Sequence, residues 1–148
     1  MVKNLQVNFD NNFNFKKNLI HSLVLFIKKE LNCKLISLVI NFVNSAYLLE
    51  INRKYLNHNF ETDIITFNYS GSHKSLDGEI YISFEEAVLN ALKFGVSKND
   101  EYFRLVIHGI LHLMGFDDHY KNDKREMKRM EDSLLKKFTA QQNRNNIS

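Results

Sequence analysis

The chain has 148 residues, of which 44% are hydrophobic and 25% are charged, and its formal net charge is +3. These values exclude a disordered or fibrous protein and predict one globular domain with a core of its own. The mild positive charge permits an anionic partner such as a nucleic acid without requiring one, because the basic residues are dispersed. A single cysteine, Cys33, excludes an internal disulfide. We expect it to be buried, in a protein of the reducing cytoplasm.

The first half of the chain predicts alternating strands and helices. The expected elements are a strand at 5–9, a helix from Asn14 to about residue 30, a strand at 34–43 and a helix from Asn44 or Ser45 through Tyr55. The apolar stretch at 19–27 is too short to span a bilayer and is interrupted by His21 and Ser22. We interpret it as the core-facing side of the first helix.

The second half predicts two strands followed by helices. Strands are expected at 63–69 and 79–84, with a flexible loop at 70–77 between them. A helix that opens at Ser83 runs to about residue 94, and another runs from Asn99 or Asp100 to 114. An amphipathic helix at 121–138 and a polar, disordered tail at 139–148 follow. Ser83 and Glu86 form a capping-box pattern at the start of the first of these helices. Strands and helices are mixed without a regular alternation, which predicts a single α+β domain over residues 1–138 with one mixed sheet.

Two histidines four residues apart, His108 and His112, lie on the most apolar predicted helix. This spacing places both imidazoles on one face, one turn apart, where they can chelate a single ion. A lone histidine on a buried helix is more often satisfied by backbone carbonyls, but this pair is followed by Gly115, which permits a left-handed helix end, and by an Asp-Asp-His cluster at 117–119. Two ligands from a helix and a third from a return loop leave one position open, as in a catalytic zinc site.

Two residues compete for the place of third ligand. In the zinc pattern H-E-x-x-H-x-x-G-x-x-H the last ligand follows the second histidine by six residues, and that position is Asp118 here, with His119 one residue further. Carboxylate oxygen binds zinc at about the same distance as imidazole nitrogen, so we favour Asp118. His119 replaces it only if the turn after Gly115 accommodates one extra residue. We therefore predict one zinc ion bound by His108, His112 and Asp118.

Gly109 occupies the position at which H-E-x-x-H proteases carry their general-base glutamate. A peptide-cleaving mechanism of that kind would lack its proton acceptor. A metal ion lowers the pKa of a bound water and offsets the charge that develops on phosphate oxygens, so the site favours hydrolysis of phosphodiesters. The residue pattern identifies no separate catalytic base.

The string His108-Gly-x-Leu-His112-Leu-x-Gly115-Phe-Asp117 resembles the YbeY family of bacterial endoribonucleases. The resemblance covers about 45–130, and it is supported by Asn52 with Tyr55, by the segments 62–67 and 78–83, and by Arg104-Leu105. It implies a mixed sheet with helices packed around a metal-bearing cleft, and a zinc-dependent, single-strand-directed endoribonuclease in which a metal-activated water attacks the phosphodiester. It also implies a role in ribosomal RNA maturation, especially at the 3′ end of 16S rRNA, and in ribosome quality control. The implied partners are precursor ribosomal RNA and the small ribosomal subunit or its proteins, with no membrane.

Three positions depart from the pattern of the family. Most members have histidine where Asp118 stands, so the ligand at that position is implied by alignment and not by identity. Many members have arginine directly after the tyrosine, where this chain has Leu56. Arg53 lies three residues before Leu56 on nearly the same helix face, and it either serves instead or is a solvated surface residue. Glu79 replaces the usual aspartate and keeps its charge.

Arg104 lies one turn before His108, on the ligand-bearing face of the predicted helix. It contacts either a substrate phosphate, to which a guanidinium is well matched, or carboxylates around Asp117 in a salt bridge. In the helix at 121–138 basic and acidic residues alternate, and we interpret them, Glu131 included, as a solvated face with i,i+4 pairs and not as an RNA-binding stripe.

Two other functions compete with the metal-dependent ribonuclease. In the first, the protein is a non-catalytic ribosome-assembly factor whose metal is mainly structural. In the second, it is a different metal hydrolase, such as a peptidase with its general base elsewhere. Gly109 counts against this second alternative.

Overall fold

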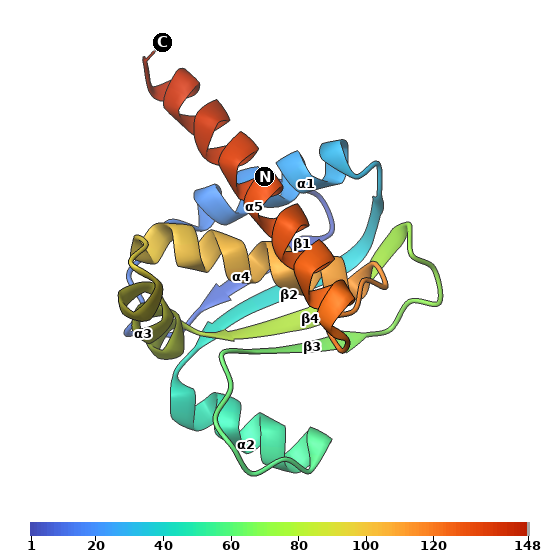
Figure 1. The fold of residues 1–148 in the computed structure, drawn as a ribbon, viewed down its shortest axis with the longest axis vertical. Helices are drawn as coiled ribbons and strands as arrows, with labels where there is room; N and C mark the ends of the chain where they lie inside the picture. Colours follow the sequence, from blue (N-terminus) through green and yellow to red (C-terminus); the bar gives the residue numbers. More distant parts are fainter. Residues whose placement is uncertain (148) are drawn as a thin grey trace.

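A four-stranded mixed sheet forms the centre of the computed structural model, which describes residues 1–147. The elements in chain order are β1 (Leu5–Phe9), α1 (Lys17–Glu30), β2 (Lys34–Val43), α2 (Ser45–Leu56), β3 (Ile64–Asn68), β4 (Ser75–Ser83), α3 (Phe84–Phe94), α4 (Lys98–Leu113) and α5 (Lys121–Ile147). The strand order is β1-β2-β4-β3, with β1, β2 and β4 parallel and β3 antiparallel to β4. Helix α2 lies on one face of the sheet, and α1, α4 and α5 lie on the other (Figure 1). The predicted α+β class is confirmed.

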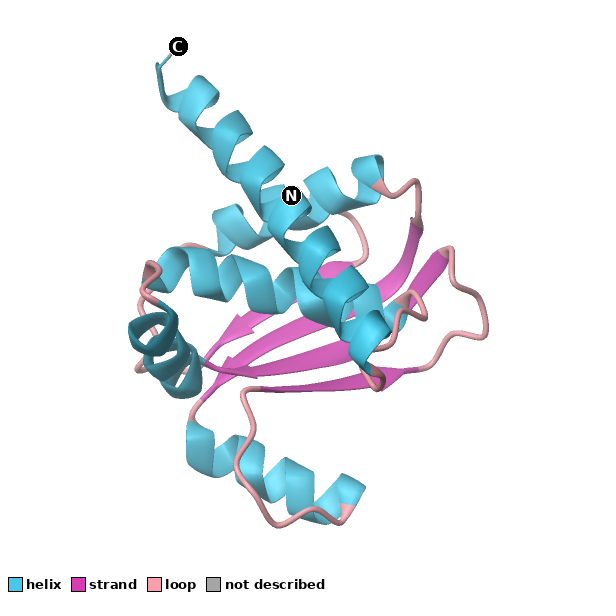
Figure 2. Ribbon diagram, viewed as in Figure 1, coloured by secondary structure: helices cyan, strands magenta, loops and turns pink. Residues whose placement is uncertain are grey.

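Helix α4 lies over the sheet, between the strands and α5, and most of its residues are buried. Its buried residues are Glu101, Tyr102, Phe103, Leu105, Val106, Ile107, Gly109, Ile110, Leu111 and Leu113. Beneath it, β4 turns its alternate residues Leu76, Gly78, Ile80 and Ile82 into the core, as the period of a half-buried strand requires. Figure 2 shows this layer of helices across the strands. Burial on nearly all sides makes α4 a rigid support for the residues on its remaining face.

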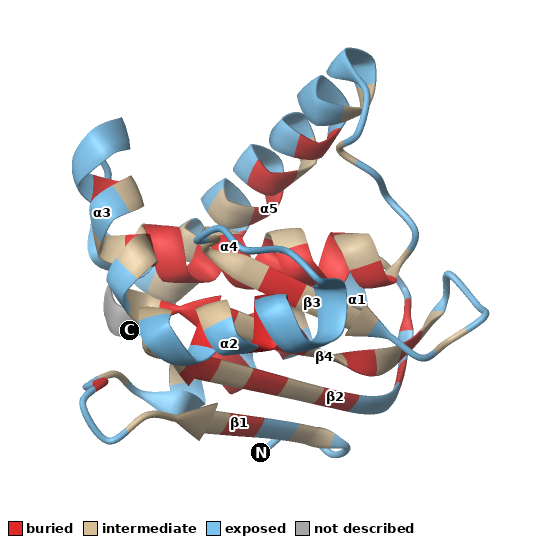
Figure 3. Ribbon diagram, turned by 90° about the horizontal axis from the view of Figure 1, so that it is seen from below, coloured by how far each residue is buried: buried red, intermediate tan, exposed pale blue. Residues whose placement is uncertain are grey.

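A second, smaller core lies on the opposite face of the sheet, under α2. Leu48 and Ile51 of α2 pack against Ile65 of β3 there, with Phe67 and Tyr81 at the edge of the cluster. Figure 3 shows that the outer side of α2 is exposed, while the elements behind it are buried. Since α2 covers only part of this face, the main core lies on the side of α4.

Side-chain caps begin three of the helices. Asn44 accepts a hydrogen bond from the backbone N–H three residues later at 2.8 Å, and Ser83 accepts one from the N–H of Glu86 at 3.0 Å. Asn44, one of the two predicted starts, is thus the cap of α2. Ser83 caps α3 as predicted, but its own N–H donates to the carbonyl of Asp63 at 2.9 Å, so only half of the capping box forms. Ser97 caps α4 in the same way, so this helix begins at Lys98, slightly before the predicted start. Such caps satisfy N–H groups that the first turn of a helix leaves without an intrahelical partner.

The first helix begins later than predicted. Asn14 does not cap it: α1 starts at Lys17, without a side-chain cap. The reason lies in the preceding segment, where the ring of Phe13 stacks on Phe42 at 4.9 Å and on Phe84 at 5.1 Å between ring centroids. Holding Phe13 between these rings keeps the chain around Asn14 out of the helix.

The core-facing side of α1 is where its periodicity predicts it. Ile20, Leu23, Val24 and Ile27 are buried, so the apolar stretch at 19–27 packs against the domain. Cys33, just after the helix, is also buried, as predicted, and burial raises the pKa of its thiol. Among the helices that the structure describes, none combines the length and the apolar character needed to cross a bilayer.

The last helix is longer than predicted. We expected it to end near residue 138, but α5 continues to Ile147 and projects away from the rest of the fold (Figure 1). Neither proline nor glycine occurs after Lys121, so nothing in the sequence stops the helix. Ser148, the last residue of the predicted tail, lies outside the described residues.

Strand β4 begins at Ser75, inside the segment predicted to be a flexible loop. Ser75, Leu76 and Asp77 pair with the first residues of β2, and Leu76 is buried in the core. Gly78 follows, paired to both neighbouring strands, where a Cβ atom would overlap the carbonyl oxygen of Phe67 and lie 2.9 Å from Cδ2 of Leu113. Gly78 directly follows the segment predicted to be a loop, but in the structure it lets β3 and α4 approach the strand closely.

Replacing Gly78 by alanine should lower the free energy of unfolding by about 3 kcal/mol, because a methyl group pressed against a backbone carbonyl cannot be relieved by a side-chain rotation. Urea denaturation followed by circular dichroism measures this change. Gly71→Ala is the matched control, since nothing lies within 4 Å of a Cβ atom built there. Equal unfolding midpoints for the two variants would show that the sheet accommodates the methyl group.

Candidate metal centre

The two histidines of α4 converge on one point at the surface of the domain. His108 and His112 lie on the same face of the helix, and their Nε2 atoms are 3.0 Å apart. Gly109, on another side of the helix, faces the sheet: a Cβ atom there would lie 2.9 Å from Cδ1 of Ile80 and 3.1 Å from Cδ1 of Ile64. A glutamate at this position would have to enter the core, so the fold explains why the protease base is absent.

The turn after α4 brings a carboxylate back to the histidines. Gly115 has a φ of 93°, and the N–H of Phe116 donates to a carbonyl of the last helical turn at 3.0 Å, which reverses the chain. Asp117 then accepts the backbone N–H groups of Asp118 at 2.7 Å and His119 at 3.1 Å. This tight turn orients Asp118 towards α4.

The resulting cluster fits a zinc ion. Oδ2 of Asp118 lies 3.5 Å from Nε2 of each histidine, which completes a triangle with the 3.0 Å contact between His108 and His112. In a tetrahedral site with bonds of about 2.0–2.1 Å, ligand atoms lie about 3.3 Å apart. Two imidazole nitrogens and one carboxylate oxygen are also donors that zinc accepts. The cluster could therefore hold one such ion and keep one position open.

Asp118, and not His119, is the residue that the structure brings to the histidine pair. The three cluster residues offer ligand atoms that all lie within 4.8 Å of one another. His119 is exposed, and its ring packs on that of Tyr120, 5.6 Å away between centroids. The turn thus favours the predicted set of ligands, whose binding of an ion stays a prediction.

A buried carboxylate lies behind the first histidine. Glu131 of α5 is 3% exposed, and its Oε2 hydrogen-bonds Nδ1 of His108. Because a carboxylate only accepts, this contact places the ring proton on Nδ1 and leaves the lone pair of Nε2 directed into the cluster. Burial by itself raises the pKa of Glu131, but hydrogen bonds and charges from His108 and Arg104 outweigh it and hold the pKa below its ordinary value.

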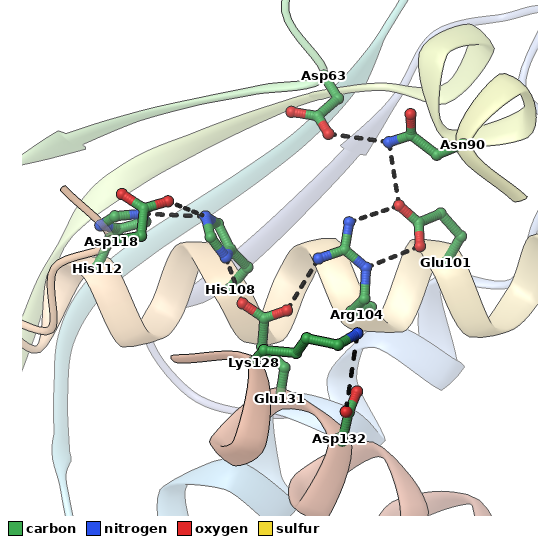
Figure 4. A network of polar contacts seen from close by, with 10 residues as sticks. All are labelled: Asp63, Asn90, Glu101, Arg104, His108, His112, Asp118, Lys128, Glu131 and Asp132. Atoms are coloured by element: carbon green, nitrogen blue, oxygen red, sulfur yellow. Dashed lines mark hydrogen bonds and ion pairs between the residues drawn. The ribbon is translucent and has the colours of Figure 1, made fainter. Parts of the chain in front are cut away.

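Arg104 connects this carboxylate to a longer polar network. Its Nη1 donates to Glu131 at 2.9 Å, and its Nε and Nη2 donate to Glu101 at 2.8 and 2.6 Å. Asn90 of α3 donates to Glu101 at 3.1 Å and to Asp63, before β3, at 2.9 Å. Figure 4 shows how these contacts join four segments of the chain to the first histidine.

The arginines predicted as candidate RNA contacts are both engaged with other side chains. Arg104 forms the ion pairs of one predicted alternative, but with Glu101 and Glu131 instead of the carboxylates around Asp117. Its pKa is raised, chiefly by the hydrogen bonds to Glu101. Arg53 donates to Asn59 at 2.5 Å, beyond the end of α2. Either arginine would therefore have to exchange these bonds for bonds to the substrate in order to contact it.

Glu131 is the site residue that the sequence interpretation missed. We predicted the charges of the last helix to be solvated pairs, and Arg129 with Glu126, 3.2 Å apart on the surface, is such a pair. Glu131 is the exception, because it lies four residues after Met127 and three before Leu134, and all three are buried. A lone acid within the apolar stripe of a helix is the signal that could have identified it.

Removing the carboxylate of Asp118 should remove the metal. Asp118→Ala is expected to lose most of its bound zinc after purification, because two imidazoles alone form an incomplete site. His119→Ala, which changes the neighbouring exposed residue, should keep the same zinc content as the unmodified protein. Metal analysis by mass spectrometry measures both. If His119→Ala loses its zinc and Asp118→Ala keeps it, His119 is the third ligand and Asp118 is not.

Neutralising the carboxylate behind His108 should weaken metal binding without removing a ligand. We expect Glu131→Gln to lower zinc affinity about 10- to 100-fold, because the amide no longer fixes the tautomer of the histidine ring. Competition with a chromophoric chelator measures the affinity. Glu126→Gln on the exposed face of the same helix is the matched control. An unchanged affinity in Glu131→Gln would limit Glu131 to a role in stability.

Comparisons with known proteins show the family to which the chain belongs. The sequence profile of the family described as Endoribonuclease YbeY matches residues 2–139. An endoribonuclease YbeY of Amoebophilus asiaticus is 39% identical over 100 residues, 68% of this chain and 68% of that protein, and one of Flavobacterium psychrophilum is 44% identical over 102 residues, 69% of this chain and 72% of that protein. A Thermotoga maritima protein solved in solution has the same fold, with a TM-score of 0.70 and 24% identity over 95% of this chain and 93% of that one. The chain therefore belongs to the Endoribonuclease YbeY family.

Proposed function

We propose that the chain is a zinc-dependent endoribonuclease that cuts single-stranded RNA. The observation that carries this proposal is the convergence of His108, His112 and Asp118 on one open position, in a chain of this family. When bound, a zinc ion lowers the pKa of a water molecule to near neutrality and offsets negative charge on phosphate oxygens. The single triangle of ligand atoms found among the described residues supports a site for one ion.

The residues around the cluster hold the ligands in place for this chemistry. Glu131 keeps His108 in the tautomer that presents Nε2, and Arg104 holds the carboxylate of Glu131 in turn. Asp118 adds a negative charge that neutralises part of the charge of a bound cation. Preorganised groups of this kind need little rearrangement when charge develops during a reaction.

We place this activity in the maturation of ribosomal RNA in the cytoplasm, including the 3′ end of 16S rRNA, and in ribosome quality control. The substrate is then precursor ribosomal RNA, with the small ribosomal subunit or its proteins as the macromolecular partner. Membership of the family and the sequence motifs support this assignment.

Two observations favour hydrolysis of RNA over the competing functions. A structural zinc site closes all four positions with protein ligands, whereas this cluster supplies three, which disfavours a purely structural metal. The packing of Gly109 against Ile80 leaves no room for the glutamate of the H-E-x-x-H peptidases. Both observations support a catalytic metal used on a phosphodiester.

The zinc-loaded protein should cut a single-stranded oligoribonucleotide and leave an unstructured peptide intact, as resolved by gel electrophoresis and mass spectrometry. His112→Ala should lose at least 100-fold in cleavage rate, because the metal loses one of its three ligands. His119→Ala, with the same chemical change outside the cluster, should keep its rate. Cleavage of the peptide alone would identify a different hydrolase.

A cellular measurement distinguishes the enzyme from an assembly factor. Cells that carry only His112→Ala should accumulate precursor ribosomal RNA, seen by primer extension and northern blotting. Normal processing with a folded His112→Ala protein would support the assembly factor with a structural metal.

A further inference from the structure

A groove opens beside the metal cluster, between α4, the first half of α5 and the end of α3. Its volume is about 350 Å³, and both His108 and Asp118 line it. Along α4 the groove extends from His108 back to Asp100, which is about 12 Å at the rise of an α-helix. A cavity of this size is at the lower end of the range for small ligands and suits a group as large as one nucleoside.

Apolar side chains line the groove at the end away from the metal. Phe94, the last residue of α3, and Val96, between α3 and α4, line it there and are 58% and 46% exposed, respectively. Met127 and Leu135 of α5 add apolar surface to the lining. An aromatic ring that stays exposed beside a groove provides a stacking surface for a nucleobase. The Nζ of Lys93 lies 5.6 Å from the centroid of the Phe94 ring.

Charged residues of both signs line the groove. The acids are Asp100, Glu101, Asp118, Glu131 and Asp132, and the basic residues are Arg104, Lys124 and Lys128. The buried acids Glu101 and Glu131 are both paired with Arg104, whose single positive charge offsets part of their negative charge. Lys124 and Lys128 line the groove from α5. Lys128 forms an exposed ion pair with Asp132, whereas the ammonium group of Lys124 has no ion-pair partner among the side chains of residues 1–145. Lys124 is therefore available to a phosphate.

We propose that this groove is the subsite for one unpaired nucleotide of the RNA, next to the phosphodiester at the metal. Its base stacks on Phe94 and contacts Val96, and a neighbouring phosphate contacts Lys124. The proposal rests on the proposed ribonuclease function and adds the part of the site that selects single strands. A base in a duplex has both faces covered by its neighbours, so it must leave the helix to enter the groove, at a cost of a few kcal/mol. The groove thus discriminates against paired RNA by its shape.

The test combines protein variants with abasic RNA. The probe is a short fluorescent single-stranded oligoribonucleotide, with a set in which one abasic nucleotide occupies successive positions around the bond that the protein cuts. Binding is measured by anisotropy with metal-free protein and cleavage with zinc-loaded protein. We expect Phe94→Ala to weaken binding about tenfold, as the loss of one base–aromatic stack does. An abasic nucleotide at one position should weaken binding to the unmodified protein by a similar factor. The same abasic nucleotide should weaken binding to Phe94→Ala little further, because that variant has already lost the stack.

Two further variants complete the design. Lys124→Ala should flatten the dependence of log affinity on log salt concentration by about 0.7, the change expected for one phosphate contact with a single strand. Leu92→Ala is the matched control for Phe94→Ala, because Leu92 is a 76% exposed apolar residue of the same helix that does not line the groove. Its affinity and cleavage rate should equal those of the unmodified protein.

The outcomes separate this proposal from the proposed function. Suppose that the unmodified protein cuts RNA, but each abasic nucleotide weakens binding to Phe94→Ala as much as it weakens binding to the unmodified protein. The subsite is then refuted and the ribonuclease stands. If Leu92→Ala weakens RNA binding as much as Phe94→Ala, the apolar end of α3 is a general contact surface, such as one for a protein, and the subsite is again refuted. If the unmodified protein neither binds nor cuts RNA, both proposals fail.

Discussion

The hydrogen bond between His108 and the buried carboxylate of Glu131 is the contact on which the candidate metal centre depends. It joins α4, which carries two of the predicted ligands, to α5, whose position limits where the loop bearing Asp118 can lie. An isolated carboxylate at 3% exposure would be costly to bury, and Arg104 offsets that cost with a direct ion pair. The same contact thus orients a ligand and holds two helices together.

The packing of α4 determines which side chains remain for chemistry. Gly109 allows the helix to lie close over Ile80, and Gly78 of β4 allows its last turn, at Leu113, to approach the strand. These contacts use the sheet-facing side of the helix for close packing and leave the side with His108 and His112 for the site. A single helix can hold the metal ligands rigidly because most of its other residues are buried.

The polar network and the groove lie along the same face of α4. Glu101, Arg104 and His108 contribute to both, so one row of side chains neutralises buried charge, orients a predicted ligand and lines the space beside the candidate metal centre. At one end of that row Asn90 ties the network to Asp63, just before β3. A change in this segment can therefore reach His108, a predicted metal ligand, through hydrogen bonds rather than through the core.

Sequence alone determined the features that depend on neighbours along the chain. The caps at Asn44 and Ser83 follow from side chains that bond N–H groups three residues later, and the pairing of His108 with His112 follows from the period of the helix. The buried α4 and the presence of the strands also follow, because hydrophobic periodicity is a local pattern.

Tertiary structure decided the features that depend on residues far apart in the sequence. The start of α1 depends on the packing of Phe13 between Phe42 and Phe84, and the start of β4 on pairing with β2. Glu131 meets His108 across 23 positions, and no local pattern reports such a contact. The placement of Asp118 instead of His119 in the cluster was decided by the turn after Gly115, because a shift of one residue in a turn redirects each side chain that follows it.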